Sequence, residues 1–220
     1  MVILETSNFF MKTSKMQSHK ELLFSTPLYI FDYGNAEILK QPLNYVLNKS
    51  QRLFVSETCR STEDDLHILP EFSKLVFDLK QRIQEVFDDI GLLREDEIIT
   101  CMWANVSKKL NRHNMHLHPN SFFSAVLYLN APENCGNIGF RDPRFGAEMM
   151  SFDFKEDSIF KHRTIEVEPI TGRLIFFPSW LYHGTRQGEF GDNENRVSLS
   201  FNIMPKTNVT DYGRKCFFTK

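Results

Sequence analysis

Three of the seven histidines lie in one short segment, and two of them have a spacing suited to metal binding. His116 and His118 are two residues apart, and on an extended strand residues i and i+2 project from the same face. Both imidazoles can therefore reach one point, as two ligands of one metal ion must. The alternative is a polar strand end on which both histidines are simply hydrated.

A third histidine, His183, follows a short predicted strand and Pro178. A lone histidine after a strand is more often structural than a metal ligand. In a sandwich or barrel, however, strands that are distant in sequence meet across the open end, so His183 can complete a site begun by His116 and His118. Three ligands on one face leave positions open for substrate and oxygen, as in non-haem iron oxygenases.

Polar side chains alternate with apolar ones from Arg196 to Asn202, so Arg196, Ser198 and Ser200 share one face of a predicted strand. A buried arginine is costly unless it meets a carboxylate. The planar guanidinium can bind a carboxylate through two parallel hydrogen bonds. We therefore expect a carboxylate partner for Arg196, unless this strand lies at a sheet edge with Arg196 in water.

Two helices are predicted ahead of the strands that must position these side chains. Apolar residues recur at helical spacing from Glu71 to Leu93, and Pro70 suits the first turn of this helix. A second, weaker helix is predicted from about residue 36 to residue 48. Pro42 must start or kink it, because proline cannot donate a helical hydrogen bond.

Short strand-like runs separated by turn residues fill the chain from residue 97 onward. They span residues 97–106, 121–130, 137–142, 163–168, 173–177, 181–185 and 196–204. Such a succession of strands without intervening helices predicts an antiparallel sandwich or barrel, with the preceding helices outside it. We expect a mainly β protein of the α+β class, a jelly roll with N-terminal helices packed on the outside.

Composition and charge exclude several classes of protein. The 220 residues are 41% hydrophobic and 25% charged, which is typical of a soluble globular chain and not of a disordered or fibrous one. The net charge of −2 provides no large positive potential that would attract the phosphate backbone of a nucleic acid. Four widely spaced cysteines without a Cys-x-x-Cys pair indicate a reducing compartment. With no long apolar run, we expect a cytoplasmic protein that binds neither membrane nor nucleic acid.

Ordered motifs between about residues 100 and 204 resemble one family. They are Trp-Ala-Asn at 103–105, His-Leu-His-Pro-Asn-Ser at 116–121, Tyr-Leu-Asn at 128–130, Asp-Pro-Arg at 142–144, Phe-Pro-Ser-Trp-Leu-Tyr-His at 177–183 and Arg-Val-Ser-Leu-Ser-Phe-Asn at 196–202. Each motif alone is weak, whereas the ordered set is specific. It resembles the 2-oxoglutarate- and Fe(II)-dependent oxygenases, in particular oxygenases of phages and marine bacteria.

The resemblance implies a double-stranded β-helix that binds Fe(II) near one open end and uses 2-oxoglutarate and O2. In this family His116 and His183 would bind iron, and Arg196 would pair with the distal carboxylate of 2-oxoglutarate. The cosubstrate pocket would also contain Ser198, Tyr128, Asn105 and Trp103. The implied reaction is hydroxylation of an unactivated C–H bond of a peptide or protein side chain or of a small molecule, with formation of succinate and CO2.

The sequence departs from the superfamily pattern at His118. The usual pattern is His-x-Asp or His-x-Glu followed by a distant histidine, so a carboxylate is expected at this position. We expect His118 to bind the metal as a third imidazole and to belong to the catalytic set with His116, His183 and Arg196, because its i, i+2 spacing directs it correctly. The alternatives are a vacant position, as in the superfamily's halogenases, and a metal other than iron.

Other proteins share parts of the pattern. Three histidines and a water also describe a zinc site like that of carbonic anhydrase, but such a site has no need for Arg196 and Tyr128 beside the metal. A cupin-like dioxygenase would have a glutamate soon after His-x-His, where this chain has Phe122 and Phe123. A non-enzymatic jelly-roll binding module is the alternative from another class.

We expect one domain with three parts. Residues 1–96 would form a helical and extended layer, residues 97–206 the double-stranded β-helix catalytic core, and residues 207–220 a C-terminal tail. The segment 145–161 is long enough to be a lid or substrate-binding loop, although an ordinary surface loop fits equally well. The expected partner is a small-molecule or peptide substrate, and a homodimer is compatible with the sequence.

Overall fold

The structure is a computed structural model that describes residues 24–34, 36–49, 53–56, 58–144, 146, 152–156, 158, 163–206, 209–211 and 214–216. Most of the predicted lid segment 145–161 lies outside the described residues, as do the first 23 residues and most of the predicted tail. Among the described residues, no helix combines the length and apolar character needed to cross a membrane.

Both predicted helices are present. Helix α1 (Lys40–Lys49) follows a 3-10 turn, Glu37–Leu39, and carries Pro42 in its first turn, where a missing N–H costs nothing. Helix α2 (Ser73–Asp89) follows a 3-10 turn that begins at Pro70. Its apolar face is buried, through Leu75, Leu79, Ile83, Val86 and Phe87.

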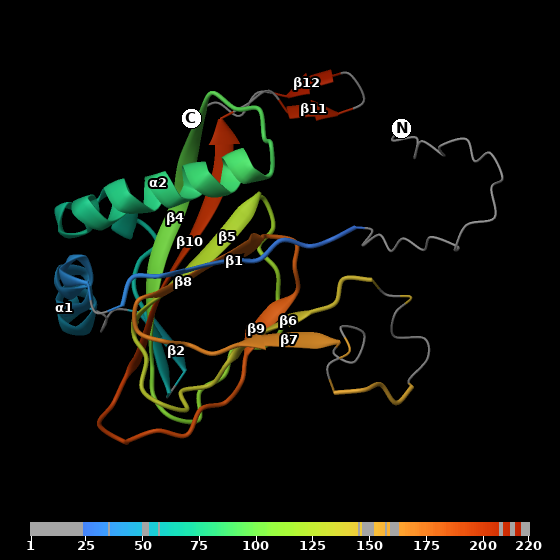
Figure 1. Cartoon of the computed structure of the whole chain (residues 1–220). Helices are drawn as coiled ribbons and strands as arrows, with labels where there is room; N and C mark the ends of the chain where they lie inside the picture. The colour runs from blue at the N-terminus through green and yellow to red at the C-terminus, as the bar shows by residue number, and fades with distance from the viewer. Residues whose placement is uncertain are drawn as a thin grey trace.

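The strands of the described chain form one large and one small antiparallel sheet, with a separate hairpin after them (Figure 1). The main sheet has the order β1 (Tyr29–Asp32), β8 (Arg173–Pro178), β5 (Phe123–Asn130), β10 (Arg196–Lys206), β4 (Asp96–Ser107), β3 (Cys59–Ser61) and β2 (Leu53–Ser56). The small sheet has the order β7 (Thr164–Val167), β6 (Ile138–Arg141) and β9 (His183–Thr185). The hairpin pairs β11 (Val209–Asp211) with β12 (Arg214–Cys216).

The main sheet has two different faces because its residues alternate in direction. One face carries Leu127 of β5 and Leu199 of β10, which pack in one apolar core with the buried faces of α1 and α2. Figure 1 shows α2 lying across β4, β10 and β5. The other face carries Val126 and Ile175, which pack against Ile138 and Phe140 of the small sheet. The expected arrangement, with helices outside a β sandwich, is therefore present.

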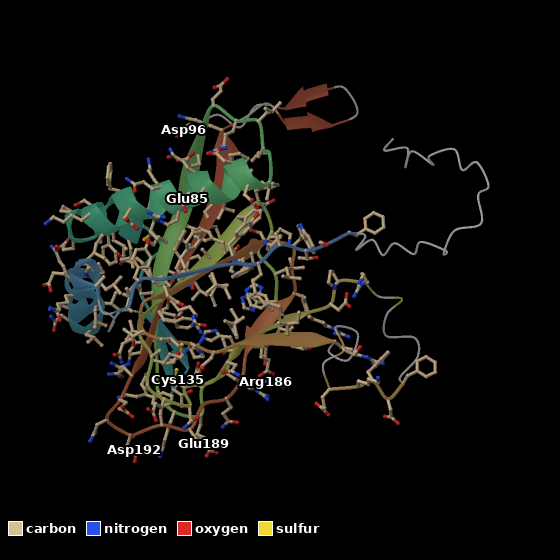
Figure 2. All side chains as sticks on the ribbon, in the orientation of Figure 1. Glu85, Asp96, Cys135, Arg186, Glu189 and Asp192 are labelled. Atoms are coloured by element: carbon tan, nitrogen blue, oxygen red, sulfur yellow. The ribbon has the colours of Figure 1, made fainter. Side chains whose placement is uncertain are left out.

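One apolar layer lies between the helices and the main sheet, and a second lies between the two sheets. Figure 2 draws the described side chains on the ribbon. In this view Asp96, at the start of β4, lies at one end of the molecule and Asp192 lies at the other. The candidate site lies in the second layer, between the sheets.

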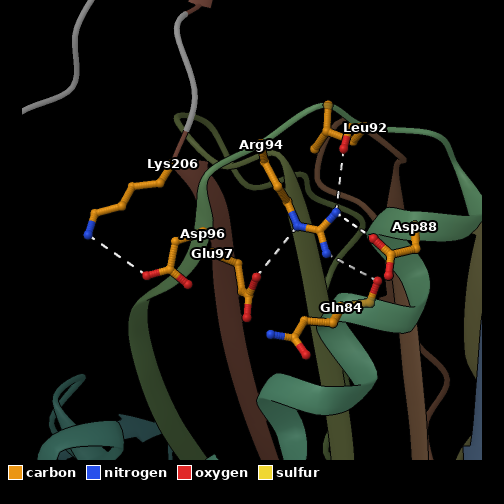
Figure 3. A network of polar contacts seen from close by, with 7 residues as sticks. All are labelled: Gln84, Asp88, Leu92, Arg94, Asp96, Glu97 and Lys206. Carbon is orange, nitrogen blue, oxygen red and sulfur yellow. Dashed lines mark hydrogen bonds and ion pairs between the residues drawn. The ribbon is translucent and has the colours of Figure 1, made fainter.

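A polar network joins the C-terminal end of α2 to the start of β4 (Figure 3). The Arg94 guanidinium donates to Asp88 at 2.8 Å and to the backbone oxygens of Leu92 and Gln84, both at 3.4 Å. It also lies 3.5 Å from the carboxylate of Glu97, whose side chain is buried. Helix α2 is thus fixed to the sheet by charge as well as by apolar contact.

The predicted strands from residue 97 onward are all present, with ends displaced by two residues or fewer. The prediction missed β1, β2 and β3, which precede them and extend the main sheet at its two edges. Each of these strands has only three or four residues, which is too short for a clear alternation of polar and apolar positions.

Candidate metal centre and cosubstrate pocket

Backbone pairing brings the three predicted histidines together. His116 and His183 exchange two hydrogen bonds, with N···O distances of 2.8 and 3.0 Å. The N–H of His118 donates to the backbone oxygen of Ser179 at 2.9 Å. The segment that contains His116 and His118 therefore continues the small sheet beyond β9, and its alternation turns both imidazoles to the interior.

The imidazoles converge on one point. One ligand nitrogen from each of His116, His118 and His183 lies within 4.8 Å of the other two, and the Nε2 atoms of His118 and His183 are 3.3 Å apart. Metal–imidazole bonds of about 2.1 Å place neighbouring ligands of one ion roughly 3.0–3.4 Å apart. The spacing of His118 and His183 therefore fits a shared metal ion.

Hydrogen bonds fix the orientation of two rings. Nδ1 of His116 lies 2.7 Å from the backbone oxygen of Asn114, and Nδ1 of His183 lies 2.8 Å from that of Leu181. A carbonyl oxygen can only accept, so each Nδ1 carries the proton and each Nε2 presents a lone pair. Partners of this kind commonly hold metal-binding histidines in place.

Burial keeps two of the rings neutral. It is the largest cause that lowers the pKa of His183 to about 3 and that of His118 to about 4, and the neighbouring His116 adds to both effects. Neutral imidazole is the form that binds metals. Aromatic rings support the cluster, since Phe177 lies 4.4 Å from His183 and Trp103 lies 5.8 Å from His118, centroid to centroid.

One cavity of about 310 Å³ between the two sheets contains the whole predicted site. The predicted residues that line it are Trp103, Asn105, His116, His118, Tyr128, His183, Arg196 and Ser198. Strand register explains how distant residues meet there, because Ser198 of β10 pairs with Asn105 of β4 on one side and with Tyr128 of β5 on the other.

Arg196 is buried in this cavity, and no carboxylate in the described part of the chain pairs with it. Arg196 is only 3% exposed. The alternative interpretation, an edge strand with Arg196 in water, is therefore wrong. Nη2 donates to the Tyr128 hydroxyl at 3.3 Å, the guanidinium lies 5.2 Å from the Tyr128 ring centroid, and Nε has no partner among the described residues. An unpaired buried cation is costly, whereas an anion in the cavity would satisfy it.

The cavity also contains residues to which the sequence assigned no role, among them His113, Ser61 and Thr185. Burial, followed by the charge of Arg196, lowers the pKa of His113 to about 4. Nε2 of His113 lies 4.0 Å from Sγ of the buried Cys59. His113 lies three residues before His116 in the sequence, and this closeness could have suggested that it belongs to the site. The alternation of strand residues alone did not place His113 in the pocket.

Solved structures share this fold at low sequence identity. HygX from Streptomyces hygroscopicus, with nickel, 2-oxoglutarate and hygromycin B bound, has a TM-score of 0.58 at 14% identity, covering 82% of this chain and 83% of that chain. A prolyl-4-hydroxylase from Pseudomonas putida has a TM-score of 0.57 at 16% identity, covering 84% and 96%. A 2OG-Fe(II) oxygenase family oxidoreductase from Burkholderia pseudomallei has a TM-score of 0.54 at 17% identity, covering 80% and 83%.

These likenesses confirm the expected double-stranded β-helix. Residues 101–202 match the sequence model of a family described as "Putative 2OG-Fe(II) oxygenase", a segment that begins in β4 and ends in β10 and includes every residue predicted for the site. No protein with curated function matches the sequence. The particular likeness to phage and marine bacterial oxygenases stays a prediction. Family match and fold together confirm that this chain resembles the 2-oxoglutarate- and Fe(II)-dependent oxygenase superfamily.

Proposed function

We propose that the protein is an Fe(II)- and 2-oxoglutarate-dependent oxygenase that hydroxylates an unactivated C–H bond of a small molecule or a peptide side chain. The observation that carries this proposal is that one cavity holds three convergent imidazoles and a buried guanidinium for which the described residues provide no carboxylate partner. Three histidines alone would suit many metalloproteins. Arg196 narrows the choice, because it requires a ligand whose anionic group lies away from the metal.

The relatives support the same cofactors. HygX has been solved with nickel and 2-oxoglutarate and also with iron, and the matching family is described as an Fe(II) oxygenase that uses 2OG. Prolyl hydroxylases from Pseudomonas putida and from a chlorella virus share the fold. Hydroxylation is therefore the favoured outcome, with a small molecule and a peptide both retained as substrate classes.

Each predicted residue has a task in this proposal. His116, His118 and His183 would hold Fe(II), Arg196 with Tyr128 and Ser198 would bind the distal carboxylate, and Asn105 and Trp103 would line the cosubstrate pocket. Bound Fe(II), 2-oxoglutarate and O2 supply the oxidation, in which one oxygen atom enters the substrate and the other enters succinate as CO2 is released.

The chain contributes orientation, charge and exclusion of water. Among the residues that the structure describes, the histidine cluster includes no carboxylate. Three neutral imidazoles would leave the charge of a bound metal ion unreduced, which favours a dianionic cosubstrate. Val126, Ile138 and Phe177 form apolar walls of the cavity, which strengthen the interaction between Arg196 and a carboxylate. A hydrolytic zinc site would give no reason to bury Arg196 there.

Anaerobic titration tests the proposal directly. Fe(II) is added to metal-free protein, followed by 2-oxoglutarate, while the visible charge-transfer band of an iron-chelated 2-oxo acid is recorded. We expect a band only when both are present, a much weaker band in Arg196→Gln at the same concentrations, and an unchanged band in Arg173→Gln, whose guanidinium pairs with Asp32 outside the cavity. Iron binding without a band would overturn the assignment of 2-oxoglutarate.

Variants of the histidines test the ligand set separately. His183→Ala should lose metal, measured as bound iron per chain after desalting, because a buried ligand is removed. His118→Asp should retain iron, since it restores the more usual superfamily triad at a position aimed at the metal. If His118→Ala bound as much iron as the wild type, His118 would not be a ligand and the position would be vacant.

A further inference from the structure

His113 lines the metal cavity, although the proposed function gives it no task. Two hydrogen bonds fix its backbone to β9. Its N–H donates to the Thr185 hydroxyl at 2.8 Å, and its carbonyl oxygen accepts from the N–H of Thr185 at 3.0 Å. A Cβ on Gly184 would lie 2.8 Å from the same carbonyl oxygen, so glycine at this position permits the close approach. The place of His113 beside β9 is therefore set by main-chain contacts.

The side chain of His113 lies at the Arg196 end of the cavity. Its Nε2 is 4.0 Å from Sγ of Cys59, and the Ser107 hydroxyl donates to the same sulfur at 3.5 Å. Ser107 of β4 pairs with Cys59 of β3 on one side and with Arg196 of β10 on the other. Residues paired across neighbouring strands lie side by side on one face, so His113 faces the row that contains Arg196.

The proposed metal ligand His118 lies toward the other end of the cavity. Its ring is 5.8 Å from that of Trp103, centroid to centroid, and Trp103 pairs with Ser200 of β10. Ser200 is four residues beyond Arg196, which corresponds to about 13 Å along an extended strand. A molecule held by the metal at one end and by Arg196 at the other would therefore have its far end beside His113.

The imidazole of His113 has a hydrogen-bond donor available for such a molecule. Burial and the charge of Arg196 lower its pKa to about 4, so at neutral pH one ring nitrogen carries a proton and the other does not. The thiol of Cys59 is a weak hydrogen-bond partner, and 4.0 Å is a long contact. His113 also lines a second hollow, on the outer side of the small sheet. Its side chain thus forms part of the wall that ends the cavity.

We propose that His113 is a specificity-determining residue of the cosubstrate pocket, where it donates a hydrogen bond to the distal carboxylate and limits the length of the 2-oxo diacid that fits. This inference rests on the proposed function and adds to it a selection among 2-oxo diacids by length. One further methylene group would press the distal carboxylate against the imidazole, and overpacking of this kind is unfavourable.

Calorimetric titration of the Ni(II)-loaded full-length protein with 2-oxoglutarate and with 2-oxoadipate, which is one methylene group longer, tests the proposal. Nickel replaces iron so that no turnover occurs during the titration. The wild type should bind 2-oxoglutarate at least roughly tenfold more tightly than 2-oxoadipate. His113→Ala should bind 2-oxoglutarate about fivefold more weakly than the wild type, because one hydrogen bond is lost. It should bind 2-oxoadipate more tightly than the wild type, because the end of the cavity is widened.

His113→Leu separates the hydrogen bond from the length limit. Leucine keeps much of the bulk and has no donor, so 2-oxoglutarate should again bind about fivefold more weakly while 2-oxoadipate stays excluded. The matched control is His67→Ala, in the 3-10 turn Leu66–Ile68 outside the cavity, which should bind both acids like the wild type.

The outcomes distinguish this inference from the function on which it rests. Equal affinity of the wild type for the two acids, or an unchanged preference in His113→Ala, would overturn the length limit and leave the proposed function intact. Unchanged 2-oxoglutarate affinity in His113→Leu would overturn the hydrogen bond. Failure of the wild type to bind either acid would overturn the proposed function, and this inference with it.

Discussion

Two arginines, Arg94 and Arg196, are both largely buried, but they lie on opposite faces of the main sheet and have opposite surroundings. The Arg94 side chain is 11% exposed and contacts the carboxylates of Asp88 and Glu97 as well as two backbone oxygens (Figure 3). Arg196 is 3% exposed, and among the described residues its guanidinium donates only to the Tyr128 hydroxyl. The chain therefore supplies partners for Arg94 and leaves Arg196 in need of one.

This difference separates the part of the molecule that is complete on folding from the part that is completed by a ligand. On the helix-covered face, charge and apolar contact together stabilise the fold. On the cavity face, the chain tolerates a buried cation that would be unfavourable in the absence of an anion. Functional sites typically contain such groups, which lower the stability of the ligand-free protein but strengthen ligand binding.

The largest expected effect is on 2-oxoglutarate affinity in Arg196→Met. Removing one partner of a buried ion pair costs roughly 3–5 kcal/mol, so the dissociation constant should rise at least a hundredfold. The same change should leave the ligand-free protein as stable as before or more stable, because it removes an unsatisfied charge. Calorimetry with 2-oxoglutarate and urea unfolding of the ligand-free protein measure the two quantities. A stability loss above 1 kcal/mol would mean that Arg196 is satisfied within the chain.

Arg94→Met should give the reverse pattern. It leaves the buried Glu97 carboxylate without its cationic partner, so the free energy of unfolding should fall by about 3 kcal/mol. The affinity for 2-oxoglutarate should not change, since Arg94 lies on the far face of the sheet. The double variant Arg94→Met/Glu97→Gln removes both charges and should recover part of the loss. Equal stability of the single variant and the wild type would show that the network contributes nothing.

The side chains that face the cavity from both sheets could be predicted from the sequence because the patterns that reveal them are local. The i, i+2 pair of His116 and His118 and the alternation after Arg196 place side chains on a strand face without knowledge of the partners. The order of the motifs then supplied the family resemblance. Helix α2 was predictable for the same reason, since its apolar stripe lies within one segment.

Features that depend on pairing between distant segments could not be predicted. Strand β1 is defined by its pairing with β8, in which Asp32 faces Arg173 and forms an ion pair with it. Neither four-residue segment reveals that partnership by itself. The same holds for Glu97, a charged residue that is buried beside Arg94.

The pH dependence of the unfolding free energy tests whether the charge of Arg196 lowers the pKa of the neighbouring His113. The pKa of His113 is about 4 in the folded chain and about 6.5 when unfolded. Between these values the unfolded state binds more protons, so this contribution to stability is complete above about pH 6.5 and is lost as the pH falls toward 4. His113→Gln should reduce the slope of unfolding free energy against pH in this window by about 1 kcal/mol per unit.

The two arginine variants separate the causes of that pKa. Burial is the larger cause and the charge of Arg196 the next, so the pKa of His113 should rise in Arg196→Met without reaching 6.5. In Arg94→Met it should not move. Titration of the imidazole signals by NMR measures both. An unchanged pKa in Arg196→Met would show that the guanidinium does not act on His113.

The smallest effect is expected from removing one hydroxyl group. Tyr128→Phe keeps the aromatic ring beneath the Arg196 guanidinium but removes the oxygen that lies 3.3 Å from Nη2. In the proposed pocket this hydroxyl also donates to the distal carboxylate of 2-oxoglutarate. One such hydrogen bond contributes about 1 kcal/mol, so the dissociation constant for 2-oxoglutarate should rise roughly fivefold. Metal affinity should stay unchanged, since the change leaves the converging imidazoles of His116, His118 and His183 intact.

The matched control is Tyr29→Phe, on β1 at the edge of the main sheet. Its hydroxyl donates to Asp89 at the end of α2, with an O···O distance of 2.6 Å, so its loss concerns attachment of the helix and not the cavity. Tyr29→Phe should bind 2-oxoglutarate like the wild type. If both variants weakened binding equally, the effect would come from general loosening of the sheet. If neither did, the carboxylate would depend on Arg196 and other groups of the pocket, and the role assigned to the Tyr128 hydroxyl would be wrong.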